Sequence, residues 1–202
     1  MIARDEITRY MSNGIILPGS DTGKTNETTN VRYADRLETI EGKTLAYVDW
    51  GKPNGDRLYE IFDTVFRDEF GVESVDYYQK PTPSSPIPRE TYTEIMESDA
   101  EAVIMAIADC GSCNTSIVVD AISFEQENIP TVQIITTKFF DLNSKISKSK
   151  GYEKLPLITI DHPSRYLDEN EVRQVAENIK WTVEQIITCE DCIVAPTGSA
   201  SG

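Results

Sequence analysis

The most informative stretch of the chain is Glu101-Ala-Val-Ile-Met-Ala-Ile-Ala-Asp-Cys-Gly-Ser-Cys113. Its first part, residues 101–108, is an almost unbroken apolar run, which is typical of a strand buried on both faces of a parallel sheet. Two cysteines follow at once, and apolar residues then recur at helical spacing from Thr115 to Asn128. The stretch therefore predicts a strand, a tight turn that carries two thiols, and a helix.

The same alternation of strand and helix extends in both directions from this unit. Strands are predicted at residues 44–49, 72–78, 101–108, 130–136 and 156–160. Helices are predicted at residues 56–70, 89–98, 115–128 and 168–188, with a helix or loop leading to residue 150. Such alternation implies a parallel sheet covered by helices on both faces, with right-handed crossovers. We therefore expect a three-layer α/β domain, flavodoxin-like or Rossmann-like, with a five-stranded parallel sheet.

The two ends of the chain lack this regular pattern. Residues 1–42 read as an N-terminal arm or lid, residues 43–190 as the α/β catalytic domain, and residues 191–202 as a flexible tail. Within the arm, Gly19-Ser-Asp-Thr-Gly-Lys-Thr25 suggests a phosphate-binding loop. That motif needs four residues between its glycines, and here there are three, so we predict a flexible loop instead.

Composition excludes several classes of function. The chain has 202 residues, 39% of them hydrophobic, and a net charge of −15. A field of this sign repels phosphate backbones and anionic lipids, so we expect neither nucleic-acid nor membrane binding. The N-terminal residues form no continuous apolar run like that of a secretory signal, which favours the cytoplasm. A small-molecule substrate is expected, with an anion as one candidate, and a partner protein or a second copy of the chain as a further partner.

In open α/β sheets, ligands bind beyond the carboxyl ends of the strands. The segments that follow the predicted strands should therefore share one rim of the sheet. This rim brings together the side chains best suited to catalysis or ligand binding, namely Lys52, Asp109, Cys110, Cys113, Lys138 and His162.

The paired cysteines are the strongest candidates for catalysis. A helix N-terminus favours the thiolate, so Cys110 is expected to be the nucleophile and Cys113 the resolving thiol. Gly111 would allow a sharp turn or the close approach of a ligand, and Ser112 or Asn114 would cap the helix. Backbone N–H groups of residues 111–114 would hold an oxyanion or carboxylate. The alternative is that two small thiols simply pack in a tight turn.

Each of the other rim residues has a functional and a structural interpretation. His162 either moves protons or bonds the backbone at a strand end. Lys52 and Lys138 either bind an anionic substrate and lower the thiol pKa, or are ordinary solvated lysines, which is the favoured interpretation for Lys138. Asn54 either contacts the substrate or, as the favoured interpretation, caps the first helix. Asp109 either relays a proton or serves as a cap or as the partner of a rim lysine.

Metal and cofactor signals are weak. A second pair, Cys189 and Cys192, invites a four-cysteine zinc site, but the separation from Cys113 is far longer than in a zinc ribbon. We therefore expect no metal. No Gly-x-Gly-x-x-Gly pattern follows any predicted strand, so we expect no nicotinamide dinucleotide and name no cofactor.

The chain resembles the UGSC family, which is named after a motif whose first position is selenocysteine or cysteine. The resemblance rests on Asp109-Cys-Gly-Ser-Cys113, Gly51-Lys-Pro-Asn-Gly-Asp-Arg-Leu58, Lys80-Pro81, Ile129-Pro-Thr-Val132 and His162-Pro163, within residues 43–188. Selenium at the first position implies a nucleophilic or redox role for Cys110. A more distant likeness, to the selenoprotein B component of glycine, sarcosine and betaine reductases, is confined to the idea of the motif.

Three functions are compatible with these patterns. The preferred one is a thiol-dependent redox enzyme, in which Cys110 attacks a small molecule and Cys113 completes a reductive cleavage or a disulfide exchange. The second is a cysteine-dependent lyase, hydrolase or isomerase without net redox change. The third is a non-catalytic carrier or binding subunit of a larger complex.

Overall fold

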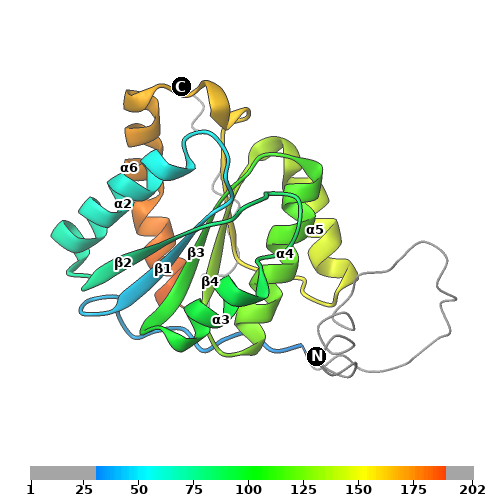
Figure 1. Ribbon diagram of the computed structural model, residues 1–202, viewed down its shortest axis with the longest axis horizontal. Coiled ribbons are helices and arrows are strands. Elements are labelled where there is room, and N and C mark those ends of the chain that lie inside the picture. Colours follow the sequence, from blue (N-terminus) through cyan, green and yellow to red (C-terminus); the bar gives the residue numbers. More distant parts are fainter. Residues whose placement is uncertain (1–30, 190–202) are drawn as a thin grey trace, which may run out of the picture.

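The computed structural model describes residues 31–189, which form a five-stranded, all-parallel sheet between two layers of helices (Figure 1). The strand order is β2-β1-β3-β4-β5, and all four pairings are parallel. The strands are β1 (Thr44–Asp49), β2 (Ser74–Gln79), β3 (Ala100–Ala108), β4 (Thr131–Thr136) and β5 (Leu157–Ile160). This order is flavodoxin-like, so the predicted fold class is confirmed.

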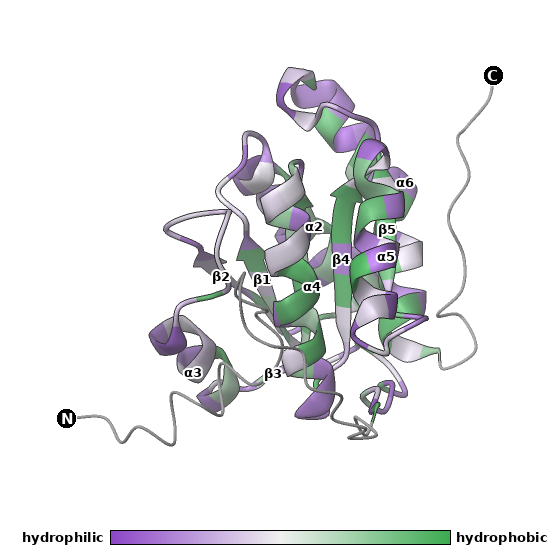
Figure 2. Ribbon diagram, turned by 90° about the vertical axis from the view of Figure 1, so that its right-hand side faces the viewer, coloured by the Kyte–Doolittle hydropathy of each residue, from purple (hydrophilic) through white to green (hydrophobic). Residues whose placement is uncertain are grey.

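Within residues 31–189, five α-helices cover the two faces of the sheet. Helices α2 (Gly55–Phe70) and α6 (Glu169–Thr188) pack on one face, and α3 (Arg89–Glu97), α4 (Gly111–Gln126) and α5 (Phe140–Ser149) lie on the other (Figure 1). Two short 3₁₀ helices, η1 (Thr137–Phe139) and η2 (Ser164–Tyr166), follow β4 and β5. Helix α4 is apolar along most of its length because it is buried rather than amphipathic (Figure 2).

Most predicted elements are confirmed to within a few residues, and the largest difference concerns α4. This helix begins at Gly111 rather than Thr115, so Cys113 lies in its first turn. Gly71 ends α2 as its C-cap, with a left-handed φ of 69° that glycine adopts readily. Asp168 caps α6 through a capping box with Glu171, which fixes the start of the longest helix.

Residues 31–43 run along the amino ends of the strands. The backbone N–H of Ala34 donates to Glu125 at 2.8 Å, and Glu125 in turn accepts from Thr131 at the start of β4. The Tyr33 hydroxyl accepts from the backbone of Lys154, just before β5. This part of the predicted arm therefore lies at the sheet edge opposite the carboxyl rim and covers no site there. Residues 1–30, including the glycine-rich loop, lie outside the described residues.

The strand order reverses between β1 and β3, which are neighbours although β2 lies between them in sequence. Helix α2 follows β1 on one face of the sheet, and α4 follows β3 on the other. The loops after these two strands therefore diverge and leave a crevice, which is where ligands bind in open α/β sheets. The loop after β3 carries Asp109 and Cys110.

Gly55, the first residue of α2, is buried against the Asp49 carboxylate at the end of β1. That carboxylate accepts hydrogen bonds from the Tyr77 hydroxyl and the Gly51 N–H, both at 2.7 Å, so it is not free to move. A methyl group at position 55 would overlap with it. We expect Gly55→Ala to lower the free energy of unfolding by about 1–3 kcal/mol, measured by urea denaturation.

Gly111→Ala is the matched control for this prediction. A Cβ at position 111 meets only Leu142, at an ordinary 3.8 Å, and Gly111 is not among the positive-φ residues. The control should therefore unfold at the wild-type midpoint or slightly above it. Equal destabilisation of both variants would contradict the steric explanation.

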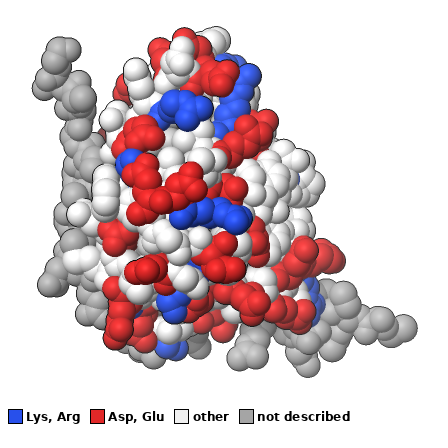
Figure 3. Space-filling view, turned by 90° about the vertical axis from the view of Figure 1, so that its left-hand side faces the viewer, with Lys and Arg blue, Asp and Glu red and all other residues white. Residues whose placement is uncertain are grey.

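The molecular surface reflects the acidic composition. On the face shown in Figure 3, Asp and Glu side chains cover much of the area and Lys and Arg are interspersed among them. No helix within residues 31–189 is both long and apolar enough to cross a membrane.

Candidate active site

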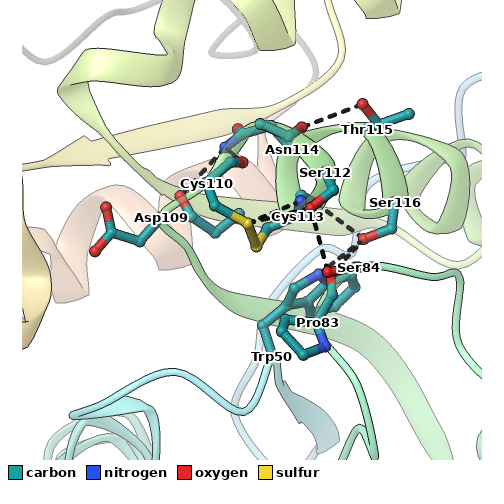
Figure 4. The surroundings of a disulfide bond; sticks show 12 residues. Trp50, Pro83, Ser84, Asp109, Cys110, Ser112, Cys113, Asn114, Thr115 and Ser116 are labelled. Carbon is teal, nitrogen blue, oxygen red and sulfur yellow. Dashed lines mark hydrogen bonds between the residues drawn. A yellow bond between two sulfur atoms is a disulfide. The ribbon is translucent and has the colours of Figure 1, made fainter.

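Cys110 and Cys113 are joined by a disulfide at the start of α4, with their Cα atoms 5.2 Å apart (Figure 4). Cys110 is the N-cap residue and is partly exposed, whereas Cys113 is fully buried. The two sulfurs are therefore not equivalent, because only Cys110 is open to an incoming molecule. This asymmetry matches the predicted roles of an attacking and a resolving thiol, and those roles stay a prediction.

The cap of α4 differs from the one that we expected. Neither Ser112 nor Asn114 caps the helix, because the Cys110 sulfur itself accepts a hydrogen bond from the Cys113 N–H at 3.2 Å. The extended backbone of Cys110 places its sulfur over the first turn. In the reduced protein, an N–H donor and the helix dipole at this position would stabilise a thiolate.

The loop after β2 packs against the disulfide from the side. The Ser112 hydroxyl lies 3.5 Å from the Cys110 sulfur and donates to Ser84 at 3.2 Å. The Ser116 hydroxyl is 3.0 Å from the carbonyls of both Pro83 and Cys113 and accepts from the Trp50 indole (Figure 4). Ser116 therefore links the cysteine pair to the loops after β1 and β2.

A buried ion pair holds this loop in place. Lys80 is the first residue after β2. Its Nζ lies 3.5 Å from Asp120 of α4, 2.6 Å from the Ser85 carbonyl and 3.6 Å from the centroid of the Trp50 ring. Burial lowers the pKa of Lys80 and raises that of Asp120, while their mutual attraction opposes both shifts. Sequence analysis missed this pair. The prolines between residues 81 and 88 were a signal that the loop is rigid.

A second polar cluster surrounds the carboxylate of Asp109, the residue before Cys110. His162 Nδ1 is 2.6 Å from Asp109 Oδ1, and Asp109 also accepts from the hydroxyls of Thr136, at 2.9 Å, and Ser164, at 3.0 Å. Asp109 is therefore neither a helix cap nor the partner of a rim lysine. Its carboxylate orients His162 so that Nε2 remains for acid–base work.

The two clusters are adjacent but face different ways. In Figure 4 the Asp109 carboxylate points away from the disulfide, although Asp109 and Cys110 are neighbours in the chain. His162 makes no hydrogen bond to either sulfur in this disulfide form, and its ring instead contacts Phe139 edge-on. The structure thus brings His162 to Asp109, and its action on Cys110 stays a prediction.

A cavity of about 260 Å³ opens in the crevice beside these groups. It is lined by Gly51, Lys52 and Pro53 from the loop after β1, by Asp109 from the loop after β3, and by Arg165 from η2. Lys52 is therefore placed at a pocket, as a substrate-binding residue should be. Arg165 was missed, because it belongs to no recognisable motif and lies in a short exposed turn.

Three other predicted binding residues are placed differently. Asn54 stands at the N-cap of α2, but its side chain does not cap the helix and donates instead to the carbonyls of Ser164 and Leu167, at 2.8 and 3.1 Å. Asn114 is fully buried and donates to the Cys110 carbonyl at 2.9 Å, so its side chain positions the motif. Lys138 is exposed on η1 and does not line the pocket.

Nothing in the described part of the chain forms a metal centre, since residues 31–189 contain no group of three or more His, Cys, Asp and Glu side chains suited to one. Cys189 is the C-cap residue of α6 and is disulfide-bonded. Cys192 lies outside the described residues.

Fold and site together define an α/β protein with a Cys-x-x-Cys pair at the switch point of a flavodoxin-like sheet. Residues 15–189 match the sequence profile of the UGSC family, and the chain belongs to that family. The match begins well before residue 43, so the family pattern includes part of the N-terminal segment. No curated protein matches the chain.

Proposed function

We propose that the protein is a thiol-dependent redox enzyme that acts on a small molecule through Cys110 and Cys113. The observation that carries this proposal is the asymmetric disulfide at the switch point, with a partly exposed Cys110 and a buried Cys113. A pair that closes into a disulfide in this geometry can store and release two electrons. Membership of the UGSC family is consistent with this chemistry but does not by itself define a reaction.

The proposed cycle starts from the dithiol. With a disulfide substrate R–S–S–R′, the Cys110 thiolate attacks one sulfur, a mixed disulfide forms and R′–S⁻ leaves. Cys113 then loses its proton and attacks Cys110 Sγ, so that R–S⁻ leaves and the Cys110–Cys113 disulfide forms. The substrate gains the two electrons that the pair loses. Reductive cleavage of a carbon–heteroatom bond R–X has the same balance, because two electrons and a proton yield R–H and X⁻. A small thiol or a dithiol protein must then reduce the pair.

His162 is the proposed proton donor and acceptor in this cycle. Because Asp109 contacts Nδ1, Nε2 is the nitrogen that would accept the Cys113 proton or protonate the leaving group. The N–H groups of Gly111 and Ser112 are the proposed contacts for negative charge on the substrate.

A second candidate function is cysteine-dependent catalysis without net redox change, such as a lyase, hydrolase or isomerase reaction. The Asp109–His162 pair favours it, since an oriented imidazole is the usual partner of a single nucleophilic cysteine. In that case Cys113 would have no chemical role, and its replacement would leave turnover intact.

The two functions are separated by turnover of a small disulfide, such as hydroxyethyl disulfide, with dithiothreitol as the reductant. We expect Cys110→Ser to abolish protein-dependent turnover, because the attacking sulfur is lost. We expect Cys113→Ser, reduced and then freed of dithiothreitol before the disulfide is added, to stop at a mixed disulfide on Cys110, visible as a mass increase. Cys189→Ser is the control and should leave turnover unchanged.

The pH dependence of Cys110 alkylation in the reduced protein tests activation of the thiol directly. A thiol pKa below about 8.5, rising in His162→Ala, supports an activated nucleophile. A Cys110 that stays unreactive in the folded, reduced protein contradicts both catalytic functions and supports the carrier hypothesis.

A further inference from the structure

Two cations line the cavity beside Asp109, the residue before Cys110 in the chain, and neither forms an ion pair within residues 31–189. Lys52 approaches from the loop after β1, and Arg165 approaches from η2. Neither makes an ion pair or a side-chain hydrogen bond anywhere in residues 31–189, although the chain carries a net charge of −15. Acidic side chains are abundant, so two unpaired cations at one small cavity indicate a site that is built for an anion.

Buried hydrogen bonds fix the two cation-bearing segments relative to each other. Asn54 follows Lys52 closely and donates to the carbonyls on both sides of Arg165, those of Ser164 and Leu167. The Ser164 hydroxyl in turn donates to Asp109 at 3.0 Å. The segments that carry Lys52 and Arg165 are therefore held together by the Asn54 side chain.

The charge and size of the cavity restrict the ligand. Its ionisable lining consists of Lys52, Arg165 and Asp109, which gives one excess positive charge, and Asp109 would repel a dianion. A volume of about 260 Å³ corresponds to roughly nine water molecules, which is room for a small organic anion. The planar guanidinium of arginine matches the two oxygens of a carboxylate.

We propose that Lys52 and Arg165 form a carboxylate clamp, and that the substrate is a small monocarboxylic acid. This inference rests on the proposed thiol chemistry at the same site and names its substrate class. The carboxylate lies between Lys52 and Arg165, and the remainder of the molecule extends past Asp109 toward Cys110. In the disulfide form neither sulfur lines the cavity, so the thiols act on a substrate that is already held by its carboxylate.

The test compares two alkylating agents on reduced, full-length protein. Iodoacetate carries a carboxylate and iodoacetamide is its neutral isostere, and both react with the same thiolate by displacing iodide. The ratio of their rates at Cys110, read by mass spectrometry, therefore reports anion recognition and is independent of the thiol pKa. We expect Lys52→Gln and Arg165→Gln each to lower this ratio by about two- to fivefold, the effect of losing one exposed ionic contact. Lys138→Gln, which alters an exposed lysine away from the cavity, should leave it unchanged.

An unchanged ratio in both clamp variants overturns the proposal, even if Cys110 is highly reactive. A Cys110 that reacts with neither reagent contradicts the redox function instead. In that case a binding measurement tests the carboxylate clamp. For that measurement, propionate, propionamide and inorganic phosphate are titrated into the disulfide form while the ring signals of His162, the only histidine, are followed by NMR.

Saturable shifts with propionate but not with propionamide, with affinity weakened about two- to fivefold in Arg165→Gln, support the clamp. Shifts with neither overturn it. Tighter binding of phosphate than of propionate overturns the assignment to carboxylic acids. If the protein binds propionate in this way but shows no thiol turnover, the proposed redox function fails while the carboxylate clamp stands.

Discussion

Lys80→Met is expected to lower the free energy of unfolding by about 3–5 kcal/mol at neutral pH, because it leaves the buried Asp120 carboxylate without its cation. The side chains of Lys80 and Asp120 are 0% and 4% exposed, so water cannot replace the lost partner. One backbone donor remains, the Ile87 N–H, whose nitrogen lies 3.1 and 3.0 Å from the two Asp120 oxygens. Denaturant unfolding followed by circular dichroism measures the loss.

The loss should shrink in acid, and the sign follows from proton linkage. Burial raises the pKa of Asp120 above its ordinary value, and the Lys80 ammonium opposes this shift. Without the ammonium, the folded variant takes up a proton at a pH at which the unfolded chain does not. The stability of Lys80→Met therefore rises as the pH falls from 8 toward 5, by at most about 1.4 kcal/mol per pH unit.

Two comparisons isolate the charge effect. Lys43→Met removes the exposed ion pair with Glu101, whose atoms are 2.7 Å apart, and should lose no more than about 1 kcal/mol. The double variant Lys80→Met with Asp120→Asn removes both buried charges and should regain much of the stability. A double variant that is as unstable as the single one would show that Lys80 matters through packing on Trp50.

The Lys80–Asp120 pair also matters for the site. It holds the loop that carries Pro83 and Ser84, and this loop contacts Ser112 and Ser116 beside the disulfide. Loss of the pair should therefore loosen one wall of the cysteine site. In Lys80→Met at pH 5, where the fold is least affected, Cys110 alkylation should still differ from that of the wild type.

The sheet could be predicted because buried parallel strands are continuous apolar runs with a simple sequence signature. Residues 44–49 were predicted as a strand, and β1 spans Thr44–Asp49. The start of α4 could not be predicted as well, since the usual capping residues Ser112 and Asn114 were both present and a cysteine sulfur took the role. Local propensity does not distinguish these alternatives.

The predicted fold indicated which loops meet at the site, but it did not indicate which side chains contact each other there. Parallel topology alone brings the loops after β1 and β3 together, which placed Lys52 near Asp109 in advance. The pairing of Asp109 with His162 depends on side-chain directions across 53 residues of sequence, which no periodicity encodes. Arg165 and the pair of Lys80 with Asp120 were missed for the same reason.

Glu125 is the residue for which we expect the second large effect, at the opposite edge of the sheet. It is 0% exposed and accepts from Arg36 Nη2 at 2.5 Å, from the Ala34 N–H at 2.8 Å, and from both the N–H and the hydroxyl of Thr131 at 2.8 Å. One carboxylate thus joins the segment before β1 to the start of β4. Within residues 31–189, Glu125 is the partner of the Arg36 guanidinium, whose Nε and Nη1 atoms are buried without a hydrogen bond.

Glu125→Ala should lower the free energy of unfolding by about 3–5 kcal/mol, because it leaves the Arg36 guanidinium buried and unpaired. Glu127→Ala, at an exposed position two residues further along the chain, is the control and should change it by less than about 0.5 kcal/mol. Hydrogen exchange gives the decisive readout. Residues 31–43 should lose protection in Glu125→Ala before the strands do, whereas Cys110 in the folded, reduced variant should keep its alkylation rate. A changed rate would mean that this segment is coupled to the carboxyl rim, although its contacts lie at the amino ends of the strands.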